Sequence, residues 1–342
     1  MDPRAAPQRG GCVKATATAH ANIALIKYWG KANEDLIIPI TSSLSLTLDD
    51  LFTTTTVDFS SLEPTAADQA TLDGATVSGR PLERICGLLD LVRERAGIDQ
   101  PAKVTSENMV PTAAGLASSA SGFAALTGAA AVAAGLELSD RELSRLARRG
   151  SGSASRSIFG GLAIWHAGDS DETSFADPVV DHGFAQEISL VVLVLNSGPK
   201  AVSSRDGMRR TVDTSPLYES WVAEHAGHLR EALAAVADRD LPRLGEAAEA
   251  NALGMHAAMR AANPPINYMN DASCAALQAV KDARAAGFPA WATMDAGPNV
   301  KVLTSTKRAA ELEAWLQSRL KDSVPGMDTV VAHAGPGLTV TR

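Results

Sequence analysis

The sequence predicts a protein of mixed α-helix and β-strand structure, divided into about two domains. The chain has 342 residues, and most single domains are shorter than this. Residues 13–56 alternate in the way strands do, whereas several later segments have helical periodicity. A polar, turn-rich stretch over 169–184 separates two groups of such elements. We therefore expect a disordered leader over 1–12, an N-terminal α+β domain over 13–185 and a C-terminal α+β domain over 186–342.

The N-terminal group begins with strands. "VKATATAHANIALI" alternates small and apolar residues, and the β-branched run 53–57 marks a second strand. A polar hairpin or excursion is expected over 62–80, and an amphipathic helix runs from Pro81 to Gly97. Ser139 and Glu142 form a capping box that begins a further helix. The remaining elements expected here are a strand over 102–110, an Ala-rich helix over 117–135 and a strand within 159–168.

The C-terminal group begins with the continuous apolar run 187–195, which is typical of a buried strand. Three helical stretches follow, and then two strands on either side of a Gly-Pro turn. Further along, the pattern predicts an amphipathic helix and a final pair of strands. In order, these elements are expected at 215–238, 241–262, 270–286, 289–295, 299–305, 307–321 and 329–342.

Composition excludes several classes of function. Hydrophobic residues make up 45% of the chain and charged residues 20%, which is globular composition. The net charge of −8 argues against binding along a nucleic-acid backbone, although it permits a locally basic cleft for a small anion. No apolar run approaches the roughly 20 residues of a membrane-spanning helix.

The redox setting follows from the cysteines and the N-terminus. Cys12, Cys86 and Cys274 are isolated in the sequence, so neither a zinc ribbon nor a disulfide framework is expected. The N-terminal residues have no signal-peptide character. We expect a cytoplasmic protein.

The stretch "PTAAGLASSASG" (111–122) lacks bulky side chains just where a helix is expected to begin. Unpaired N–H groups and the helix dipole favour anions at such a position. Gly115 and Ala117 would let the backbone approach a phosphate, and Ser118 or Ser119 could add hydroxyls. The alternative is a small-residue helix packed against a sheet. Neither the dinucleotide fingerprint nor the Walker loop occurs in the chain.

Other segments also combine groups that bind anions. Lys27 and Lys31 accompany two aromatic residues in "IKYWGK", where they could hold a polyphosphate or could be surface lysines at a strand end. "RRGSGSASRSIFGG" (148–161) alternates serines with glycines around Arg156 and has no acidic residue. The segment 196–208 combines Lys200, Arg205 and several serines.

Asp295 is the candidate acid. It follows an expected strand in "MDAGPNV", where it could act as a base or orient a hydroxyl, or could accept backbone bonds in a turn. The chain has no G-x-S-x-G elbow and no H-E-x-x-H motif, so a serine hydrolase or a zincin is not expected. His225 and His228 are interpreted as ordinary helix histidines.

Taken together, these segments resemble the diphosphomevalonate decarboxylase family. "NIALIKYWGK", "TSSLSLTL", "PTAAGLASSASGFAAL", "RRGSGSASRSIFGG", "SSRDGM" and "MDAGPNV" occur in the order seen in that family. The family belongs to the superfamily of galactokinase, homoserine kinase, mevalonate kinase and phosphomevalonate kinase. The resemblance extends over residues 14–341, and it favours the phosphate interpretation of 111–122.

The resemblance implies a fold of two α+β lobes with the active site in the cleft between them. It implies ATP-dependent decarboxylation of (R)-5-diphosphomevalonate to isopentenyl diphosphate, with release of ADP, phosphate and carbon dioxide. ATP would phosphorylate the tertiary hydroxyl, phosphate would leave, and loss of the carboxylate would supply the electrons of the new double bond. ATP as co-substrate, Mg²⁺ and a possible homodimer are implied as well.

The resemblance also implies roles for matching residues. Asp295 would orient the tertiary hydroxyl and accept its proton, Arg156 would pair with the substrate carboxylate, and Lys27 would lie near the transferring phosphoryl group. Further residues would bind the substrate: Asn22, Tyr28, Lys31, Ser151, Ser153, Ser204 and Arg205. The ATP phosphates would lie against Gly115, Ala117, Ser118 and Ser119. No protein ligand to the metal is assigned.

Two other functions share some of these features. A superfamily kinase that phosphorylates a mevalonate-like hydroxyl without decarboxylation would have the ATP loop and Asp295, but could lack Arg156 or the serines near it. A non-catalytic metabolite-binding module would be expected to lack Asp295 or Lys27. All of these residues are present, which favours the decarboxylase.

Overall fold

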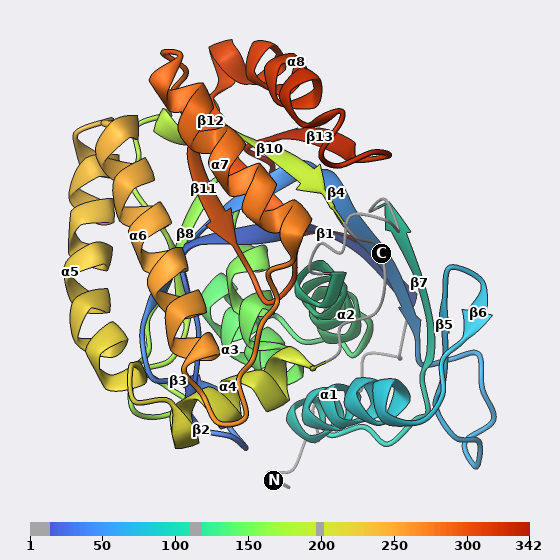
Figure 1. Ribbon diagram of the computed structural model, residues 1–342. Helices are drawn as coiled ribbons and strands as arrows, with labels where there is room; N and C mark the ends of the chain where they lie inside the picture. The colour runs from blue at the N-terminus through green and yellow to red at the C-terminus, as the bar shows by residue number, and fades with distance from the viewer. Residues whose placement is uncertain (1–13, 110–117, 196–201) are drawn as a thin grey trace, which may run out of the picture.

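Figure 1 shows the computed structural model, which describes residues 14–109, 118–195 and 202–342. The expected leader over 1–12, together with Gly115, Ala117 and Lys200, lies outside the described residues. The described part contains two main sheets with helices packed on them, and the predicted α+β class is confirmed.

The first sheet is built on two long antiparallel strands, β1 (Lys14–Ile26) and β4 (Ser43–Asp58). Its path runs β14-β1-β4-β7-β5-β6, and β8 and β9 attach through the first residues of β4. The alternation seen in the sequence buries the small side chains Ala15, Ala17 and Ala19 of β1. The other strands are β5 (Gln69–Leu72), β6 (Ala75–Thr76), β7 (Lys103–Met109), β8 (Leu162–Trp165), β9 (Ala176–Pro178) and β14 (Thr339–Thr341).

Helix α2 (Ser118–Ala133) packs directly on β1 and β4. Its alanines, among them Ala124 and Ala129, are fully buried, so the helix approaches the sheet closely. Helix α1 (Arg80–Ala96) ends at Gly97 as expected, and α3 (Asp140–Gly150) begins with the predicted capping box. The serine-rich segment after α3 folds as a short 3-10 helix, η2 (Gly152–Ile158).

The second sheet is antiparallel, with strand order β11-β12-β10-β13. Two helices, α5 and α6, pack on one face, and α7 and α8 cover the other (Figure 1). The strands are β10 (Ile188–Val194), β11 (Trp291–Met294), β12 (Val300–Ser305) and β13 (Asp328–His333). The helices are α4 (Ser204–Thr214), α5 (Tyr218–Ala237), α6 (Leu241–Arg260), α7 (Asp271–Ala285) and α8 (Ala309–Leu320). Short elements complete the chain: β2 (Lys31–Asn33), β3 (Ile38–Pro39), η3 (Phe184–Glu187) and η4 (Thr306–Arg308).

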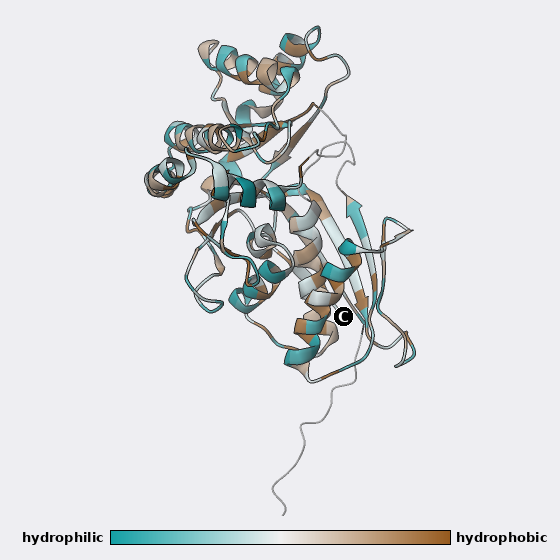
Figure 2. Ribbon diagram, turned by 60° about the horizontal axis from the view of Figure 1, so that its bottom comes forward, coloured by the Kyte–Doolittle hydropathy of each residue, from teal (hydrophilic) through white to brown (hydrophobic). Residues whose placement is uncertain are grey.

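The two sheets share a hydrophobic core. Ile23 and Leu46 of the first sheet belong to the same buried cluster as Leu190 and Val192 of the second. In Figure 2, hydrophobic and hydrophilic segments alternate along the helices, as expected where one helix face packs on a sheet. The ends of β1 and β11 are thereby held close together.

Three details differ from the sequence expectations. The last two strands do not pair with each other, because β13 joins the second sheet and β14 returns to pair with β1. The expected linker 169–184 contains β9, which pairs with β8. Helix α4 was not predicted, since its many charged and small residues resemble a loop.

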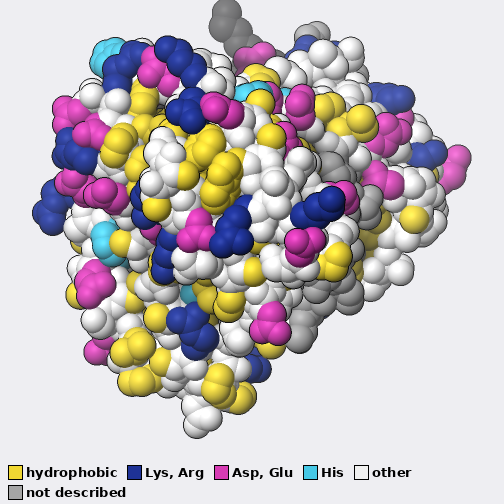
Figure 3. Space-filling view, turned by 45° about the horizontal axis from the view of Figure 1, so that its top comes forward, with side chains coloured by type: hydrophobic (Ala, Val, Ile, Leu, Met, Phe, Trp, Pro, Cys, Tyr) yellow, Lys and Arg dark blue, Asp and Glu magenta, His cyan; other side chains and the backbone are white. Residues whose placement is uncertain are grey.

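The outer surface has no single dominant charge on the face shown in Figure 3, where acidic and basic side chains are interspersed. Within the described part of the chain, no helix is long and apolar enough to cross a membrane.

Candidate active site

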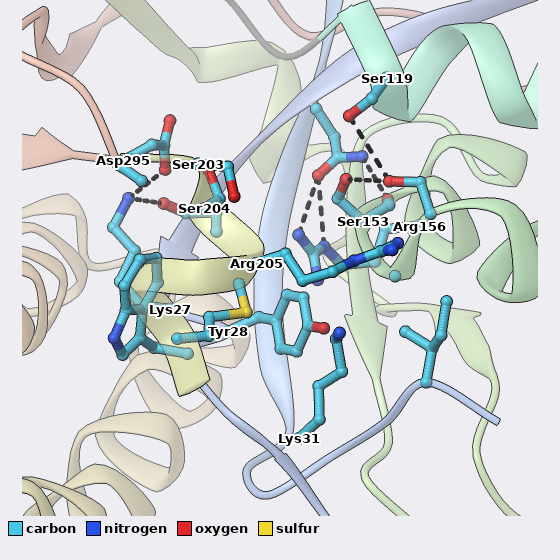
Figure 4. Close-up of a pocket in the computed structure, with 18 of the residues that line it drawn as sticks. Lys27, Tyr28, Lys31, Ser119, Ser153, Arg156, Ser203, Ser204, Arg205 and Asp295 are labelled. Atoms are coloured by element: carbon cyan, nitrogen blue, oxygen red, sulfur yellow. Dashed lines mark hydrogen bonds and ion pairs between the residues drawn. The ribbon is translucent and has the colours of Figure 1, made fainter. Parts of the chain in front are cut away.

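A cavity of about 530 Å³ lies where the ends of β1 and β11 meet α1, α2, η2 and α4. It brings together all of the predicted site residues whose side chains are described (Figure 4). These are Asn22, Lys27, Tyr28, Lys31, Ser119, Ser151, Ser153, Arg156, Ser204, Arg205 and Asp295. Ser118 is the first residue of α2, and its side chain lies outside the described part.

The cavity is strongly basic. Among its described lining residues, Asp295 is the one acid, and it faces a set of lysines and arginines. These basic residues are Lys27, Lys31, Arg80, Arg84, Arg156 and Arg205. A chain with a net charge of −8 has therefore gathered positive charge at this position, as a site for a multiply charged anion requires.

Asp295 is held between two ammonium groups. Lys27 Nζ lies 2.8 Å from Asp295 Oδ1, and Lys301 Nζ lies 3.1 Å from Oδ2. Burial alone would raise the pKa of this carboxyl, but the two lysines outweigh burial and hold the pKa well below its usual range. The carboxylate stays ionised, and 35% of the side chain remains exposed toward the cavity.

Lys27 itself is almost fully buried at the end of β1. Its Nζ also donates to the carbonyl of Ala24 at 2.7 Å. Burial lowers the pKa of Lys27 to about 8, although Asp295 partly restores it. A lysine with this pKa loses its charge more readily than a surface lysine.

The backbone of Lys27 is fixed from α6. Its N–H donates to Asn251 Oδ1 at 2.8 Å, and the Asn251 amide donates to His225 Nδ1 at 3.1 Å. His225 Nε2 in turn bonds the carbonyl of Ser42 at 2.7 Å. Burial lowers the pKa of His225 to about 4, so this histidine is neutral and acts as a hydrogen-bonding residue.

Arg156 is buried in η2, and its guanidinium is held from the first sheet. Asn22 Oδ1 accepts from Arg156 Nε at 3.2 Å and from Nη2 at 3.1 Å, and Ser43 Oγ accepts from Nη1 at 2.6 Å. Asn22 also donates to the carbonyl of Ser153 at 2.9 Å, which joins β1 to η2. Burial lowers the pKa of Arg156 to about 10, so the guanidinium stays charged at neutral pH.

Serine hydroxyls line the wall between η2 and α2. Ser151 Oγ lies 3.4 Å from Ser153 Oγ and 3.5 Å from Ser119 Oγ, so the two segments meet here. The two serines expected at the substrate diphosphate thus lie beside Ser119, which is expected at the ATP phosphates.

Tyr28 and Lys31 lie on the adjoining wall. The ring of Tyr28 packs edge-on against Trp165 with centroids 4.7 Å apart, and burial raises the pKa of the phenol, so it remains protonated. Lys31 Nζ pairs with the exposed carboxylate of Glu34. This lysine thus has an exposed partner that an anionic ligand would have to displace.

Gly30 lies between Tyr28 and Lys31 in the chain. Its φ of +103° is a backbone conformation that favours glycine. The hydroxyl of Tyr218 fills the space beside it and donates to the carbonyl of Trp29 at 2.7 Å.

The opposite wall comes from α4 and α1. Ser204 and Arg205 begin α4 just after its N-cap Ser203, whose hydroxyl accepts from Asp206 N–H at 3.1 Å. Arg84 lies on α1, where Nη2 donates to the carbonyl of Gly150 at 2.8 Å.

Sequence reasoning missed Arg80, Arg84 and Lys301, whereas Ser203 belongs to the anion-binding segment expected over 196–208. Arg80 fell in the polar stretch expected over 62–80, Arg84 looked like part of the polar face of an amphipathic helix, and Lys301 looked like part of a strand. The signal that was available for Lys301 is a single lysine in an otherwise apolar strand, "NVKVL".

Two family models match most of the chain. Residues 19–176 match the family described as "Diphosphomevalonate decarboxylase-like N-terminal domain", and residues 190–335 match "Mevalonate 5-diphosphate decarboxylase C-terminal domain". A diphosphomevalonate decarboxylase of Aspergillus fumigatus is 38% identical over 334 residues, covering 92% of this chain and 82% of the relative.

Solved structures match over nearly the whole chain. Mevalonate diphosphate decarboxylase from Staphylococcus aureus has a TM-score of 0.91 at 44% identity, covering 96% of this chain and 98% of that one. A complex described as MDDEF with MVAPP, AMPPCP and magnesium has a TM-score of 0.91 at 48% identity, covering 96% and 99%. On this similarity and on the two domain matches, the chain belongs to the diphosphomevalonate decarboxylase family.

Proposed function

We propose that the basic cavity binds (R)-5-diphosphomevalonate and ATP, and that Asp295, Lys27 and Arg156 carry out the decarboxylation. As a member of its family, the chain is an ATP-dependent decarboxylase of the mevalonate pathway. The observation that carries the proposal is the ion pair of Asp295 with Lys27, set in a cavity whose other charged, described lining residues are all basic.

Asp295 orients the tertiary hydroxyl of the substrate. An ionised carboxylate has a lone pair left on each oxygen after its lysine contacts, so it can accept the hydroxyl proton. The hydroxyl oxygen attacks the γ-phosphorus of ATP, ADP leaves, and the proton passes to the carboxylate. Lys27, 2.8 Å from Oδ1, neutralises charge on the transferring phosphoryl group.

Arg156 aligns the substrate carboxylate for the second stage. The C–O bond to the new phosphate breaks, and the electrons of the bond to the carboxylate form the double bond as carbon dioxide leaves. Asn22 and Ser43 fix the orientation of the guanidinium, which reduces the freedom that binding must otherwise remove. Once Asp295 has released the accepted proton to solvent, its carboxylate offers counter-charge to the positive carbon that develops.

The remaining walls are assigned to the charged ends of the two substrates. Ser151, Ser153, Tyr28 and Lys31 bind the substrate diphosphate, and Ser204 and Arg205 lie near its far end. Ser119, with Gly115, Ala117 and Ser118, binds the ATP phosphates at the start of α2.

Magnesium accompanies ATP. Within the described ranges, no group of three His, Cys, Asp or Glu side chains could hold a metal on its own. Mg²⁺ bound with a nucleotide is held largely by phosphate oxygens and water, and the Ser119 hydroxyl offers an oxygen of the right kind. The residues therefore fit an ion that arrives with its nucleotide and neutralises phosphate charge.

The decisive experiment measures ADP and carbon dioxide from the purified protein with diphosphomevalonate, ATP and Mg²⁺. Stoichiometric release of both products is expected from the parent. ADP without carbon dioxide would favour a kinase, and neither product would favour a binding module.

Two variants test the assigned roles. Asp295→Asn should lose at least about a hundredfold in kcat, because an amide is a far weaker proton acceptor. Near-normal turnover of this variant would contradict the role of Asp295. Arg156→Ala should reduce turnover more than the affinity for an ATP analogue, and equal losses in both would contradict the role of Arg156.

Three further properties are part of the proposal. The chain divides near residue 185, which is supported by the separate sheets on either side of it, while β14 returns to the first sheet. A cytoplasmic location is supported by the isolated cysteines. A homodimer is proposed from the family resemblance, and light scattering of the purified protein would test it.

A further inference from the structure

Lys301 occupies an unusual position for a charged residue. It lies within β12, opposite Val192 of β10 and Thr293 of β11, and its side chain is only 4% exposed. Leu303 and Val192 on the neighbouring positions belong to the hydrophobic core between the sheets. A lysine buried in such surroundings is costly unless a counter-charge meets it.

The counter-charge is the Asp295 carboxylate. Lys301 Nζ lies 3.1 Å from Oδ2, whereas Lys27 Nζ lies 2.8 Å from Oδ1. A single lysine on one oxygen would leave the carboxylate free to rotate about its bond to Cβ. Two lysines on opposite oxygens, each extending from a different sheet, fix the plane of the carboxylate.

The two lysines differ in their access to ligand. Lys27 lines the cavity, whereas Lys301 is not among its described lining residues. Lys301 therefore contacts Asp295 without itself lining the described cavity.

We propose that Lys301 is a positioning residue for the reaction, which holds the Asp295 carboxylate ionised and oriented toward the substrate hydroxyl. This inference rests on the proposed function of the site. It assigns to Lys301 no contact with either substrate, so its effect should fall on turnover and not on binding.

Other titratable groups near Asp295 also influence the pKa of its carboxyl group. Lys27 faces it from β1, Arg156 from η2 and His256 from α6. Burial lowers the pKa of His256 to about 4, so this histidine carries no charge at neutral pH. Removal of Lys301 takes away one of the two ammonium groups in contact with the carboxylate, and the pKa of Asp295 should rise.

The experiment compares Lys301→Met, Lys301→Gln and the parent over pH 5–9. Methionine keeps the length and apolar stem, and glutamine keeps a donor without the charge. We expect kcat to fall by about 10- to 100-fold in Lys301→Met and by less in Lys301→Gln, with KM for both substrates within about twofold. Because the pKa of Asp295 starts well below its usual range, its rise in these variants leaves the carboxylate ionised over pH 5–9, and the loss in kcat should be the same at every pH in this range.

Thr304→Val is the matched control. Thr304 is also buried in β12, and its hydroxyl has no hydrogen-bond partner in the described structure, so its removal should leave kcat and the pH profile unchanged. Parent activity establishes the reaction independently of these variants.

Three results would overturn the proposal. One is a Lys301→Met enzyme with parental kcat. Another is a rise in KM with unchanged kcat, which would indicate substrate contact. The third is a failure of both Lys301 variants to fold while Thr304→Val folds, which would show that Lys301 supports the fold and does not act through Asp295.

Discussion

Replacing Gly30 with alanine perturbs the backbone between two residues that line the cavity. The residue has φ of +103°, which side chains rarely adopt, and an added Cβ would lie 2.1 Å from the Tyr218 hydroxyl oxygen. Val212 and Ile40 would lie at 3.0 and 3.1 Å, so the new methyl group has no free direction. The chain can accommodate it only by moving the tyrosine or the backbone.

The cost has two parts. Backbone strain at a positive φ amounts to about 1 to 3 kcal/mol. Displacement of the Tyr218 hydroxyl breaks its 2.7 Å bond to the carbonyl of Trp29 and leaves buried polar groups unpaired, which costs about 1 to 3 kcal/mol more. Gly30→Ala should therefore lower the free energy of unfolding by about 2 to 6 kcal/mol.

The variant Gly287→Ala separates the cost of backbone strain from the cost of displacing the Tyr218 hydroxyl. Gly287 has φ of +90° with nothing within 4 Å of an added Cβ, so this variant carries the strain alone. Urea unfolding, monitored by tryptophan fluorescence, gives the free energy of unfolding of both variants. The comparison holds provided that this free energy depends equally steeply on urea concentration in both. The clash explanation is refuted if Gly30→Ala is no less stable than Gly287→Ala.

A double variant tests the same explanation from the other side. Tyr218→Phe removes the hydroxyl that the new methyl group would meet. Gly30→Ala with Tyr218→Phe should be more stable than the sum of the single effects by at least about 0.5 kcal/mol. Strict additivity would show that the two groups do not collide.

Three further predictions concern the charged centre. If the Lys27 ammonium is the active form, kcat/KM should fall as pH rises through about 8, and this limb should be absent from the residual activity of Lys27→Arg, whose guanidinium stays charged. Asn22→Ala removes the acceptor of two Arg156 N–H groups, and kcat/KM should fall by about 10- to 100-fold while the Kd of an ATP analogue, measured by calorimetry, stays within about twofold. Asn251→Ala leaves the buried Lys27 N–H without its acceptor, and urea unfolding should show a loss of about 1 to 3 kcal/mol.

The sequence was informative where local chemistry determines local structure. The capping box of Ser139 and Glu142 begins α3 as predicted, and Gly97 ends α1. These signals depend on residues a few positions apart, so no knowledge of the rest of the chain is needed.

Pairings between distant segments could not be obtained in this way. The alternating pattern of residues near 340 indicates a strand, but nothing in it shows that Val340 pairs with Ala17 and not with β13. Lys301 likewise becomes part of the site only through Asp295, whose position depends on how β11 and β12 turn.

The resemblance to the decarboxylase family assigned roles to residues whose function their spacing in the sequence left open. It assembled Asn22, Lys27 and Asp295 into one expected site, and the fold places all three on one cavity. It did not indicate that Asn22 holds Arg156, because that contact depends on side-chain packing between β1 and η2.

The pairing of β14 with β1 has a consequence for how the protein folds during synthesis. Thr339–Thr341 are synthesised long after β1, yet they cover the edge of that strand. At ordinary elongation rates that edge waits tens of seconds for its partner. During this interval the unpaired backbone groups of β1 are open to pairing with other nascent chains, so chaperone binding would matter most before β14 emerges.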